Sequence, residues 1–501
     1  MADQIKAFRC NVCGYIHRGE SSPDECPVCG SPENYFEAYT DPAAVKAESQ
    51  PEARSWRCLV CNYEHKDENP PGECPVCGTP KDKFEAVSAP DAPISTDEGK
   101  AEKIIVVGAG IAGVSAVESI RGVSSRSEVT MISKDSHLPY YRLNLTRLLA
   151  GEITLDNLPI HTETWYRENN INLMRGTEVI AVDPEKHELT ISGRTSLSFD
   201  KLVLTAGAHP FFPPIPGLRR EGVTALRSME DAEFILKSAE SADSIVVIGG
   251  GILGLEAAGA LARQSKKVTV LENFNWLMPR QLTEKAAYHL ENHLKKLGVD
   301  LKVGANIQEL TGDERVAGVV LKSGETIPAD LVIVTSGVRS NSYLARLAGL
   351  IVNNGIVVDD HLLTSHPDIY AAGDVAEHRG TLYGLWNAAQ YQGNIAGMNA
   401  AGQQAEFGGI PRSTSIKVLG VDLLSIGQFE PEDGSYVLFE EDNADSFTRF
   451  VFRDTHLVGA ILFGRNEGSS EIKNAIENKT DFSQILRKRP SVQDIINYVV
   501  G

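Results

Sequence analysis

Cysteine is missing from most of this 501-residue chain. All eight cysteines lie between positions 10 and 77, so the remainder has no thiol to act as a nucleophile, redox group or metal ligand. Long apolar runs are missing as well, because no stretch approaches the ~20 residues that a membrane-spanning helix needs. The opening residues, MADQIKAFRC, lack the apolar segment of a signal peptide. We therefore expect a cytoplasmic protein with no membrane partner.

Positive charge is scarce too, with 48 Lys and Arg against 67 Asp and Glu and a net charge of −19. Such a chain lacks the basic face that nucleic acids and anionic membranes require, which argues against nucleic acid as a partner. Residues 1–100 carry 10 basic and 18 acidic side chains, a net charge of −8, and the other 401 residues share the remaining −11. A protein that binds this N-terminal segment should therefore present a basic patch.

The cysteines form two copies of one cassette. Residues 8–38 and 56–86 are identical at 18 of 31 positions, which indicates an internal duplication. Each copy holds two CxxC pairs, and in a reducing compartment such pairs are typical of metal sites. Four thiolates can surround one ion tetrahedrally, a geometry that both zinc and iron accept. The predicted ligands are Cys10, Cys13, Cys26 and Cys29 in the first cassette and Cys58, Cys61, Cys74 and Cys77 in the second.

Two interpretations of the cassettes follow from the residues alone: zinc that stabilises two small domains, or iron that carries electrons. The segments CNVCGY and CPVCG, with the trailing YFE or KFE, resemble rubredoxin, in particular the short-spacing module found in rubrerythrins. This resemblance implies two iron ions, one per cassette, although zinc remains open. His17 and His65 occupy matching positions, and with four thiolates in each copy we expect them on the surface.

A second region begins near Lys103, where strands start to alternate with helices. This pattern predicts an α/β fold with a parallel sheet covered on both faces. A GxGxxG segment follows a strand and opens a helix, so its backbone can approach a pyrophosphate that the helix N-terminus favours. Its recurrence makes two Rossmann-like dinucleotide sites the prediction. The first turn contains Gly108, Gly110, Ala112 and Gly113, and the second contains Gly249, Gly251 and Gly254.

The residue after the next strand differs between the two turns. Beyond the second turn the strand ends VTVLE, which places Glu272 where a carboxylate binds ribose hydroxyls. This predicts NADH over NADPH, because the carboxylate would repel a 2′-phosphate. Beyond the first turn, Ser133 holds that place and Asp135 lies two residues further on. Either Asp135 reaches back to a ribose or it is a solvated turn residue.

Two further segments carry a family resemblance. LVLTAGAHP, with Thr205, Ala206 and Gly207, and DIYAAGDVAE, with Asp374, resemble the accessory motifs of the pyridine nucleotide-disulfide oxidoreductase family, flavoproteins with two dinucleotide domains. The resemblance implies that the first turn binds the adenosine half of FAD and that Asp374 hydrogen-bonds the flavin ribityl chain. It also implies an NAD-binding domain inserted within the FAD-binding domain.

The same resemblance assigns further site residues. It implies that Arg142, in PYYRLNL, lies near the FAD phosphates and that Glu256, in GLE, lies near the junction of nicotinamide and flavin. The alternatives are a surface position for Arg142 and a structural pairing for Glu256. Trp386 and Gln390 follow Asp374 in a helix-forming run and are candidates to touch the flavin ring, although core packing is the simpler expectation for Trp386.

After about Gly408 the sequence turns to strands and a helical tail, which predicts a separate C-terminal α+β domain. Its segments STSIKVLGVDLLSIG and LVGAILFG are similar to the tail domain of rubredoxin- and nitrite-type family members. The predicted domains are rubredoxin-like 6–40 and 54–88, FAD-binding 102–217 and 337–407, NAD-binding 218–336, and C-terminal 410–501.

The lack of cysteine after position 103 separates this chain from the disulfide reductases and peroxidases of the family, which use a thiol near the flavin. Among the members without it, the chain resembles NADH:rubredoxin oxidoreductases best. We expect NADH to reduce FAD, and two irons to pass single electrons to rubredoxin, rubrerythrin or a similar acceptor. An NADH oxidase and a flavoprotein with zinc recruitment domains are the alternatives, and a homodimer is our expectation.

Overall fold

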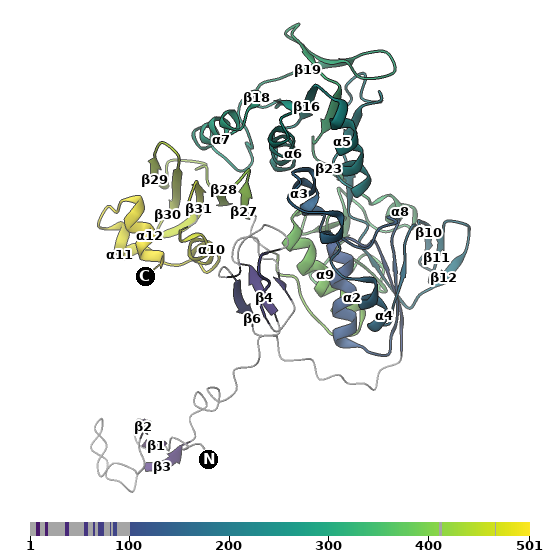
Figure 1. Cartoon of the computed structure of the whole chain (residues 1–501). Helices are drawn as coiled ribbons and strands as arrows, with labels where there is room; N and C mark the ends of the chain where they lie inside the picture. Colours follow the sequence, from purple (N-terminus) through teal and green to yellow (C-terminus); the bar gives the residue numbers. More distant parts are fainter. Residues whose placement is uncertain are drawn as a thin grey trace. The chain divides into compact units, whose positions relative to one another are not determined.

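The structure is a computed structural model of the whole chain (Figure 1). It describes residues 7–10, 16–18, 36–39, 55–58, 64–65, 69–74, 81, 84–87, 101–409, 413–465 and 467–500. The chain divides into two compact units, and the larger one holds all described residues from 101 onward. Among the described residues, no helix combines the length and apolar character needed to cross a membrane.

The two cassettes repeat one three-stranded antiparallel sheet. In the first, β1 (Ala7–Cys10) lies between β2 (Ile16–Arg18) and β3 (Phe36–Tyr39), and in the second β4 (Ser55–Cys58) lies between β5 (Glu64–His65) and β6 (Phe84–Val87). The register is the same, since Cys10 pairs with Phe36 and Cys58 pairs with Phe84. The duplication read from the sequence is thus a duplication of structure.

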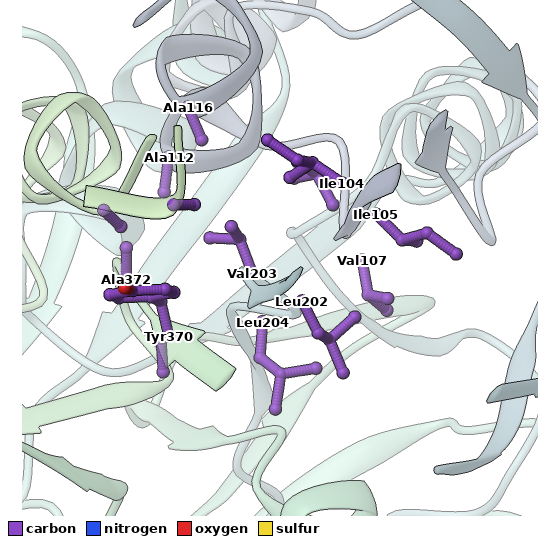
Figure 2. Packing of buried hydrophobic residues seen from close by; sticks show 14 of the residues in the cluster. Ile104, Ile105, Val107, Ala112, Ala116, Leu202, Val203, Leu204, Tyr370 and Ala372 are labelled. Atoms are coloured by element: carbon purple, nitrogen blue, oxygen red, sulfur yellow. The ribbon is translucent and has the colours of Figure 1, made fainter. Parts of the chain in front are cut away.

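The first α/β domain is built on a five-stranded parallel sheet in the order β25-β13-β7-β8-β9. Apolar side chains cover both faces of its central strand, as a parallel sheet between helices requires. Figure 2 shows this packing, with Val107 of β7 near Leu202 and Leu204 of β13 on one face of the sheet and Ile104 on the other face. The strands are β7 (Lys103–Val107), β8 (Glu128–Ile132), β9 (Ile171–Met174), β13 (Lys201–Leu204) and β25 (Ile369–Ala371), and the first helix is α2 (Ile111–Val123).

The second α/β domain repeats the plan with a parallel sheet in the order β15-β22-β16-β17-β18. It lies between β13 and β25 of the first sheet in sequence, so it is an insertion, as the family resemblance implied. Its strands are β15 (Val223–Ala225), β16 (Ser244–Ile248), β17 (Lys267–Leu271), β18 (Val299–Lys302) and β22 (Leu331–Val334), and its helices are α5 (Met229–Ser241), α6 (Ile252–Arg263) and α7 (Glu284–Lys296).

Smaller elements complete these two domains. The two chain crossings between them pair as an antiparallel ribbon, β14 (Ala208–Pro210) with β23 (Val338–Ser340). Each domain also carries a three-stranded antiparallel sheet, formed by β10 (Val179–Asp183), β11 (Glu188–Ile191) and β12 (Ser196–Ser198), and by β19 (Ile307–Thr311), β20 (Gly318–Leu321) and β21 (Thr326–Pro328). The remaining elements are η3 (Arg142–Asn144), α3 (Leu145–Leu149), η4 (Leu155–Asn157), α4 (Glu163–Glu168), α8 (Tyr343–Leu347), β24 (Ile356–Val358), β26 (Ala376–His378) and α9 (Trp386–Ala400).

Helices α2 and α9 pack side by side with their backbones in contact (Figure 1). A Cβ atom added at Gly393 of α9 would lie 2.2 Å from the carbonyl oxygen of Ala112, and one added at Gly397 would lie 2.4 Å from that of Ala116. Only glycine permits so close an approach. This contact fixes α9 against the helix that opens at the first glycine turn.

A Gly397→Ala variant should therefore lose about 1–3 kcal/mol of stability, because the added methyl group overpacks the contact between the helices. Gly122→Ala on α2 is the matched control, since a Cβ there meets no atom within 4 Å and alanine favours the helix by about 0.5–1 kcal/mol. Urea unfolding of both variants measures the two effects. Equal shifts in the same direction would contradict the close-packing argument.

The C-terminal domain has a five-stranded antiparallel sheet in the order β27-β28-β31-β30-β29. Three helices cover one face with their own apolar cluster. The other face is not independent, because Leu423, Phe447, Ile461 and Phe463 share a hydrophobic cluster with helices α6 and α7. The predicted separate unit is thus attached to the second domain through a common core. Its elements are β27 (Ser413–Val418), β28 (Val421–Gly427), β29 (Tyr436–Asp442), β30 (Phe447–Arg453), β31 (His456–Phe463), α10 (Ser469–Glu477), α11 (Ser483–Leu486) and α12 (Val492–Val500).

Candidate functional site

The two glycine turns have the same geometry. Gly108 and Gly249 have φ angles of +113° and +119°, a backbone conformation that disfavours side chains. A Cβ atom at Gly108 would lie 2.3 Å from the carbonyl oxygen of Thr205, and one at Gly249 would lie 2.7 Å from that of Thr335. Each turn is thus pressed against the end of the neighbouring strand.

A threonine holds each turn from that strand. The Thr205 hydroxyl donates to the carbonyl oxygens of Val107 and Gly108 at 3.1 and 2.8 Å. The Thr335 hydroxyl donates to those of Ile248 and Gly249, both at 3.1 Å. Sequence reasoning missed Thr335, although VIVTSG repeats the pattern of LVLTAG and was a readable signal.

The third glycine of each turn permits the tight start of the helix. A Cβ atom at Gly113 would lie 2.0 Å from the carbonyl oxygen of Gly108, and one at Gly254 would lie 2.1 Å from that of Gly249. The middle glycines differ, because a Cβ atom at Gly110 or Gly251 meets no atom within 4 Å. The turns are therefore tightly packed on the protein side and have room at their outer rim.

Helices α2 and α6 begin at these open glycines. Gly110 and Gly251 are the N-caps, with no side-chain cap and no acidic residue in the first turn of the helix. In contrast, Ser228 caps α5 and Thr283 caps α7, and both of those helices carry acids in their first turn. The uncapped N–H groups of α2 and α6 can therefore bind an anion such as a dinucleotide pyrophosphate.

Glu272 lies at the end of β17 beside the second turn. It is 8% exposed, and its carboxylate accepts the N–H groups of Gly250 and Phe274 at 2.7 and 2.8 Å. These bonds hold the carboxylate at the rim of the turn. The position agrees with the predicted ribose contact, which remains a prediction, as does the preference for NADH.

The first turn lacks this carboxylate. Ser133 takes the equivalent place, since Ser133 N–H donates to Met174 O and Glu272 N–H donates to Lys302 O in the same way. Asp135 is half-buried, and its carboxylate accepts the N–H of His137 at 3.0 Å. Asp135 thus closes its own loop, and its binding of a ribose stays a prediction.

Asp374 lies in a cluster of charged groups from both α/β domains. Arg227 Nη2 contacts the Asp374 carboxylate at 2.9 Å, and Arg227 Nε donates to the carbonyl oxygen of Ala208 at 3.1 Å. Arg142 Nη1 donates to the carbonyl oxygen of Arg227. Burial lowers the pKa of Arg142, and the nearby Arg227 lowers it further, while Tyr140, Asp135 and Asp374 oppose this shift. Arg142 therefore belongs to an internal cluster, which contradicts the surface alternative.

Sequence reasoning missed Arg227, because no motif surrounds it. It follows β15 of the second domain, yet its guanidinium lies in the first. The predicted Ala206 and Gly207 lie near the same cluster, where the Asn341 side chain donates to Ala206 O at 2.7 Å and the Asn341 N–H donates to Gly207 O at 2.9 Å. Chain segments from three parts of the sequence therefore meet around Asp374.

Buried polar atoms test whether the site fits FAD. Trp386 Nε1 and Gln392 Nε2 are buried donors on α9 without an acceptor among the described residues. The Gln392 amide oxygen accepts the N–H of Gly373, next to Asp374, at 2.8 Å. Buried donors normally have partners, so these atoms fit a site for a polar cofactor. Trp386 lies 5.9 Å from the ring of Tyr141, and Gln390 is buried on the same helix.

Glu256 of α6 is hydrogen-bonded to the C-terminal domain. Its carboxylate accepts the N–H of Leu419 in the C-terminal domain at 2.7 Å. Burial raises the pKa of Glu256, while the Leu419 N–H and Arg263 lower it. The structure thus supports the structural alternative for Glu256, and its role at the nicotinamide stays a prediction.

Three of the predicted metal ligands lie among the described residues. Cys10 and Cys58 end the central strands of their cassettes, and Cys58 and Cys74 are fully buried. Burial of each cysteine is compatible with a role as a thiolate metal ligand, because thiolates bind soft metal ions such as iron and zinc. The other five, Cys13, Cys26, Cys29, Cys61 and Cys77, lie outside the described residues, whereas His17 lies on β2, where it pairs with Phe8 of β1.

Two parallel sheets, two uncapped glycine turns and an internal charged cluster define a flavoprotein with two dinucleotide-binding domains. A family model described as pyridine nucleotide-disulphide oxidoreductase matches residues 102–393. The chain belongs to this family. The model of the rubredoxin NAD+ reductase C-terminal domain matches residues 413–480, and that of the rubrerythrin rubredoxin-like domain matches residues 8–37 and 56–85.

Curated relatives agree with this assignment. The nitrite reductase [NAD(P)H] of Bacillus subtilis is 35% identical over 386 residues, which cover 76% of this chain and 48% of the relative. The NADH-rubredoxin oxidoreductase of Clostridium acetobutylicum is 30% identical over 386 residues, which cover 77% of this chain and 97% of the relative. The chain spans about half the length of the first two relatives it matches.

Solved structures share the fold. The NADH:rubredoxin oxidoreductase of Clostridium acetobutylicum has a TM-score of 0.69 and 29% identity, covering 80% of this chain and 100% of its own. Putidaredoxin reductase in its covalent complex with putidaredoxin has a TM-score of 0.73 and 25% identity, covering 80% and 99%. The chain is thus a member of the pyridine nucleotide-disulphide oxidoreductase family that combines the C-terminal domain of rubredoxin NAD+ reductases with rubrerythrin-type rubredoxin-like domains.

Proposed function

We propose that this protein passes electrons from NADH through FAD to iron in its own two cassettes, and from there to a one-electron acceptor protein such as rubredoxin or rubrerythrin. One observation carries the proposal: a flavoprotein core with no cysteine of its own is joined to two four-cysteine cassettes in one chain. Electrons therefore cannot leave the flavin through a cysteine of the core, as they do in related enzymes that have one. The cassettes provide the acceptor instead.

Different residues bind the two dinucleotides. The uncapped helix α6 and Glu272 hold NADH, and α2, Asp374, Arg227 and Arg142 hold FAD. When bound, FAD accepts two electrons as hydride and can release them singly. Each set of four thiolates, with iron bound, accepts one electron. Two cassettes thus match the two electrons that one NADH supplies.

Anaerobic titration with NADH tests this proposal. The intact protein should take up about four electrons, two on FAD and one on each iron, and so consume about two NADH. Cys29→Ser should remove one electron by emptying the first cassette, and Cys77→Ser should do the same for the second. The double variant should consume about one NADH, with full bleaching of the flavin band.

The ferric-thiolate absorption bands provide the readout. They should bleach together with the flavin in the intact protein and halve in each single variant. Uptake of one NADH by the intact protein, with zinc and no iron in metal analysis, would refute the iron route and leave the recruitment alternative.

An NADH oxidase is the second candidate, because the chain is 32% identical over 340 residues to a protein called NADH oxidase from Methanocaldococcus jannaschii. In that case the double variant would consume oxygen at the rate of the intact protein. The proposed route predicts instead that reduction of an added rubredoxin falls in the double variant while flavin reduction by NADH is unchanged.

A further inference from the structure

The turn that joins β27 to β28 lies against helix α6. Leu419 and Gly420 form this two-residue turn, with φ angles of +52° and +87°, the combination typical of a tight hairpin. The Leu419 side chain is only 5% exposed. A Cβ atom added at Gly259 of α6 would lie 2.2 Å from Leu419 Cδ2. The missing side chain of Gly259 thus leaves the space that Leu419 fills.

Two helices of the NAD-binding domain bind the backbone of the same residue. Glu256 of α6 accepts the Leu419 N–H at 2.7 Å, and the His293 Nε2 of α7 lies 3.1 Å from the Leu419 carbonyl oxygen. Leu419 is therefore bound by its N–H, its carbonyl group and its side chain. A leucine that adopts a positive φ, which costs energy for a residue with a Cβ atom, is held here by three independent contacts.

Helix α6 is fixed on its other side by the second glycine turn. Its Gly254 packs on the carbonyl oxygen of Gly249 and on the hydroxyl of Thr335. The helix starts at Gly251, and Glu256 lies five residues further, about 7.5 Å along the axis. The N–H groups that face the pyrophosphate are therefore positioned from one side by Thr335 and from the other by Leu419.

We propose that Leu419 and Glu256 are positioning residues for the nicotinamide nucleotide, by which the C-terminal domain holds α6 in the orientation that binds its pyrophosphate. This inference rests on the proposed binding of NADH at the second turn. It gives the Glu256 carboxylate a positioning contact with the C-terminal domain. A fixed helix binds the anion more tightly, because no free energy is spent on ordering the amides.

ADP-ribose is the probe, because it carries the pyrophosphate and both riboses but no nicotinamide. Its affinity for the FAD-loaded full chain is measured by titration calorimetry. Leu419→Ala and Gly259→Leu should each weaken ADP-ribose binding about tenfold. The first variant removes the Leu419 side chain from the space beside Gly259, and the second fills that space with a side chain of α6 and displaces Leu419. Leucine favours helix formation more than glycine, so Gly259→Leu can test the proposal even if Leu419→Ala does not fold.

Two variants of Glu256 separate its roles. Glu256→Gln keeps an oxygen that can accept the Leu419 N–H, and its ADP-ribose affinity should stay within about twofold of the parent. Glu256→Leu removes the acceptor and should weaken ADP-ribose binding as Leu419→Ala does. Loss of hydride-transfer rate in Glu256→Gln, with unchanged ADP-ribose affinity in Glu256→Leu, would place the carboxylate at the nicotinamide and overturn the proposal.

Asp442→Ala is the control, because it removes the acceptor of a hydrogen bond from α7 and changes no residue of α6. Asp442 accepts a hydrogen bond from His289 at 2.7 Å. This variant should lower the melting temperature and leave ADP-ribose affinity unchanged. If Leu419→Ala and Gly259→Leu behave like Asp442→Ala, the turn only stabilises the fold and the proposal is wrong. Iron plays no part in this measurement, so its outcome is independent of the electron route.

Discussion

Gly113→Val protein should be purified without FAD, whereas Gly254→Val protein should be yellow and resist reduction by NADH. In each case the added side chain begins within 2.0–2.1 Å of a carbonyl oxygen in the same turn, so the backbone of that turn must move. The two substitutions are chemically identical and occupy equivalent places in two sheets. They differ only in which dinucleotide the damaged turn is predicted to hold.

The FAD content of the purified proteins, measured after release by heat, gives the first half of the result. Dithionite should reduce the flavin of Gly254→Val normally, while the rate of flavin reduction by NADH should fall about a hundredfold, the penalty typical of a misplaced substrate. Far-ultraviolet circular dichroism shows whether each variant is folded. A colourless Gly254→Val together with a yellow Gly113→Val would reverse the assignment of the two turns.

The parts predicted well from sequence are those whose signals are local. Each glycine turn joins a strand to a helix within a few residues, so spacing alone predicts its geometry. The duplicated cassettes also align residue by residue, down to the pairing of Cys10 with Phe36 and of Cys58 with Phe84. The inserted domain followed from the order of motifs and is confirmed by the sheet order.

The parts that sequence reasoning missed depend on contacts between distant segments. Arg227 and Asp374 are 147 residues apart, and Glu256 and Leu419 are 163 residues apart. No periodicity or turn chemistry links such pairs, because their approach follows from how whole domains pack. The same reason explains why the C-terminal domain was expected to be separate. The continuous buried runs of β28 and β31 indicate two covered faces, but they do not show that α6 and α7 cover one of them.

Replacing Glu272 should remove the preference for NADH. Ser133 occupies the equivalent place beside the first turn. Replacing Glu272 with serine therefore gives the second turn the side chain that the first turn has at this place. Glu272→Ser should lower kcat/KM for NADH about 10–100-fold, because a hydrogen bond to a charged group contributes about 1.5–3 kcal/mol. The rate with NADPH should rise, as the 2′-phosphate no longer meets a carboxylate.

Glu272→Gln separates charge from hydrogen bonding at this position. Its amide oxygen can still accept the N–H of Gly250 or Phe274, the two donors that hold the carboxylate now. We therefore expect it to keep more of the NADH activity than Glu272→Ser while still gaining NADPH activity.

Glu314→Ser, which replaces an exposed residue in the same domain, is the control and should alter neither rate. An unchanged ratio of NADH to NADPH rates in both Glu272 variants would show that another group selects the nucleotide. Because Glu272 binds one backbone N–H of the glycine turn and one of its own loop, the stability of each variant must be compared at the same time. Only a change in the ratio of the two rates reports on nucleotide selection.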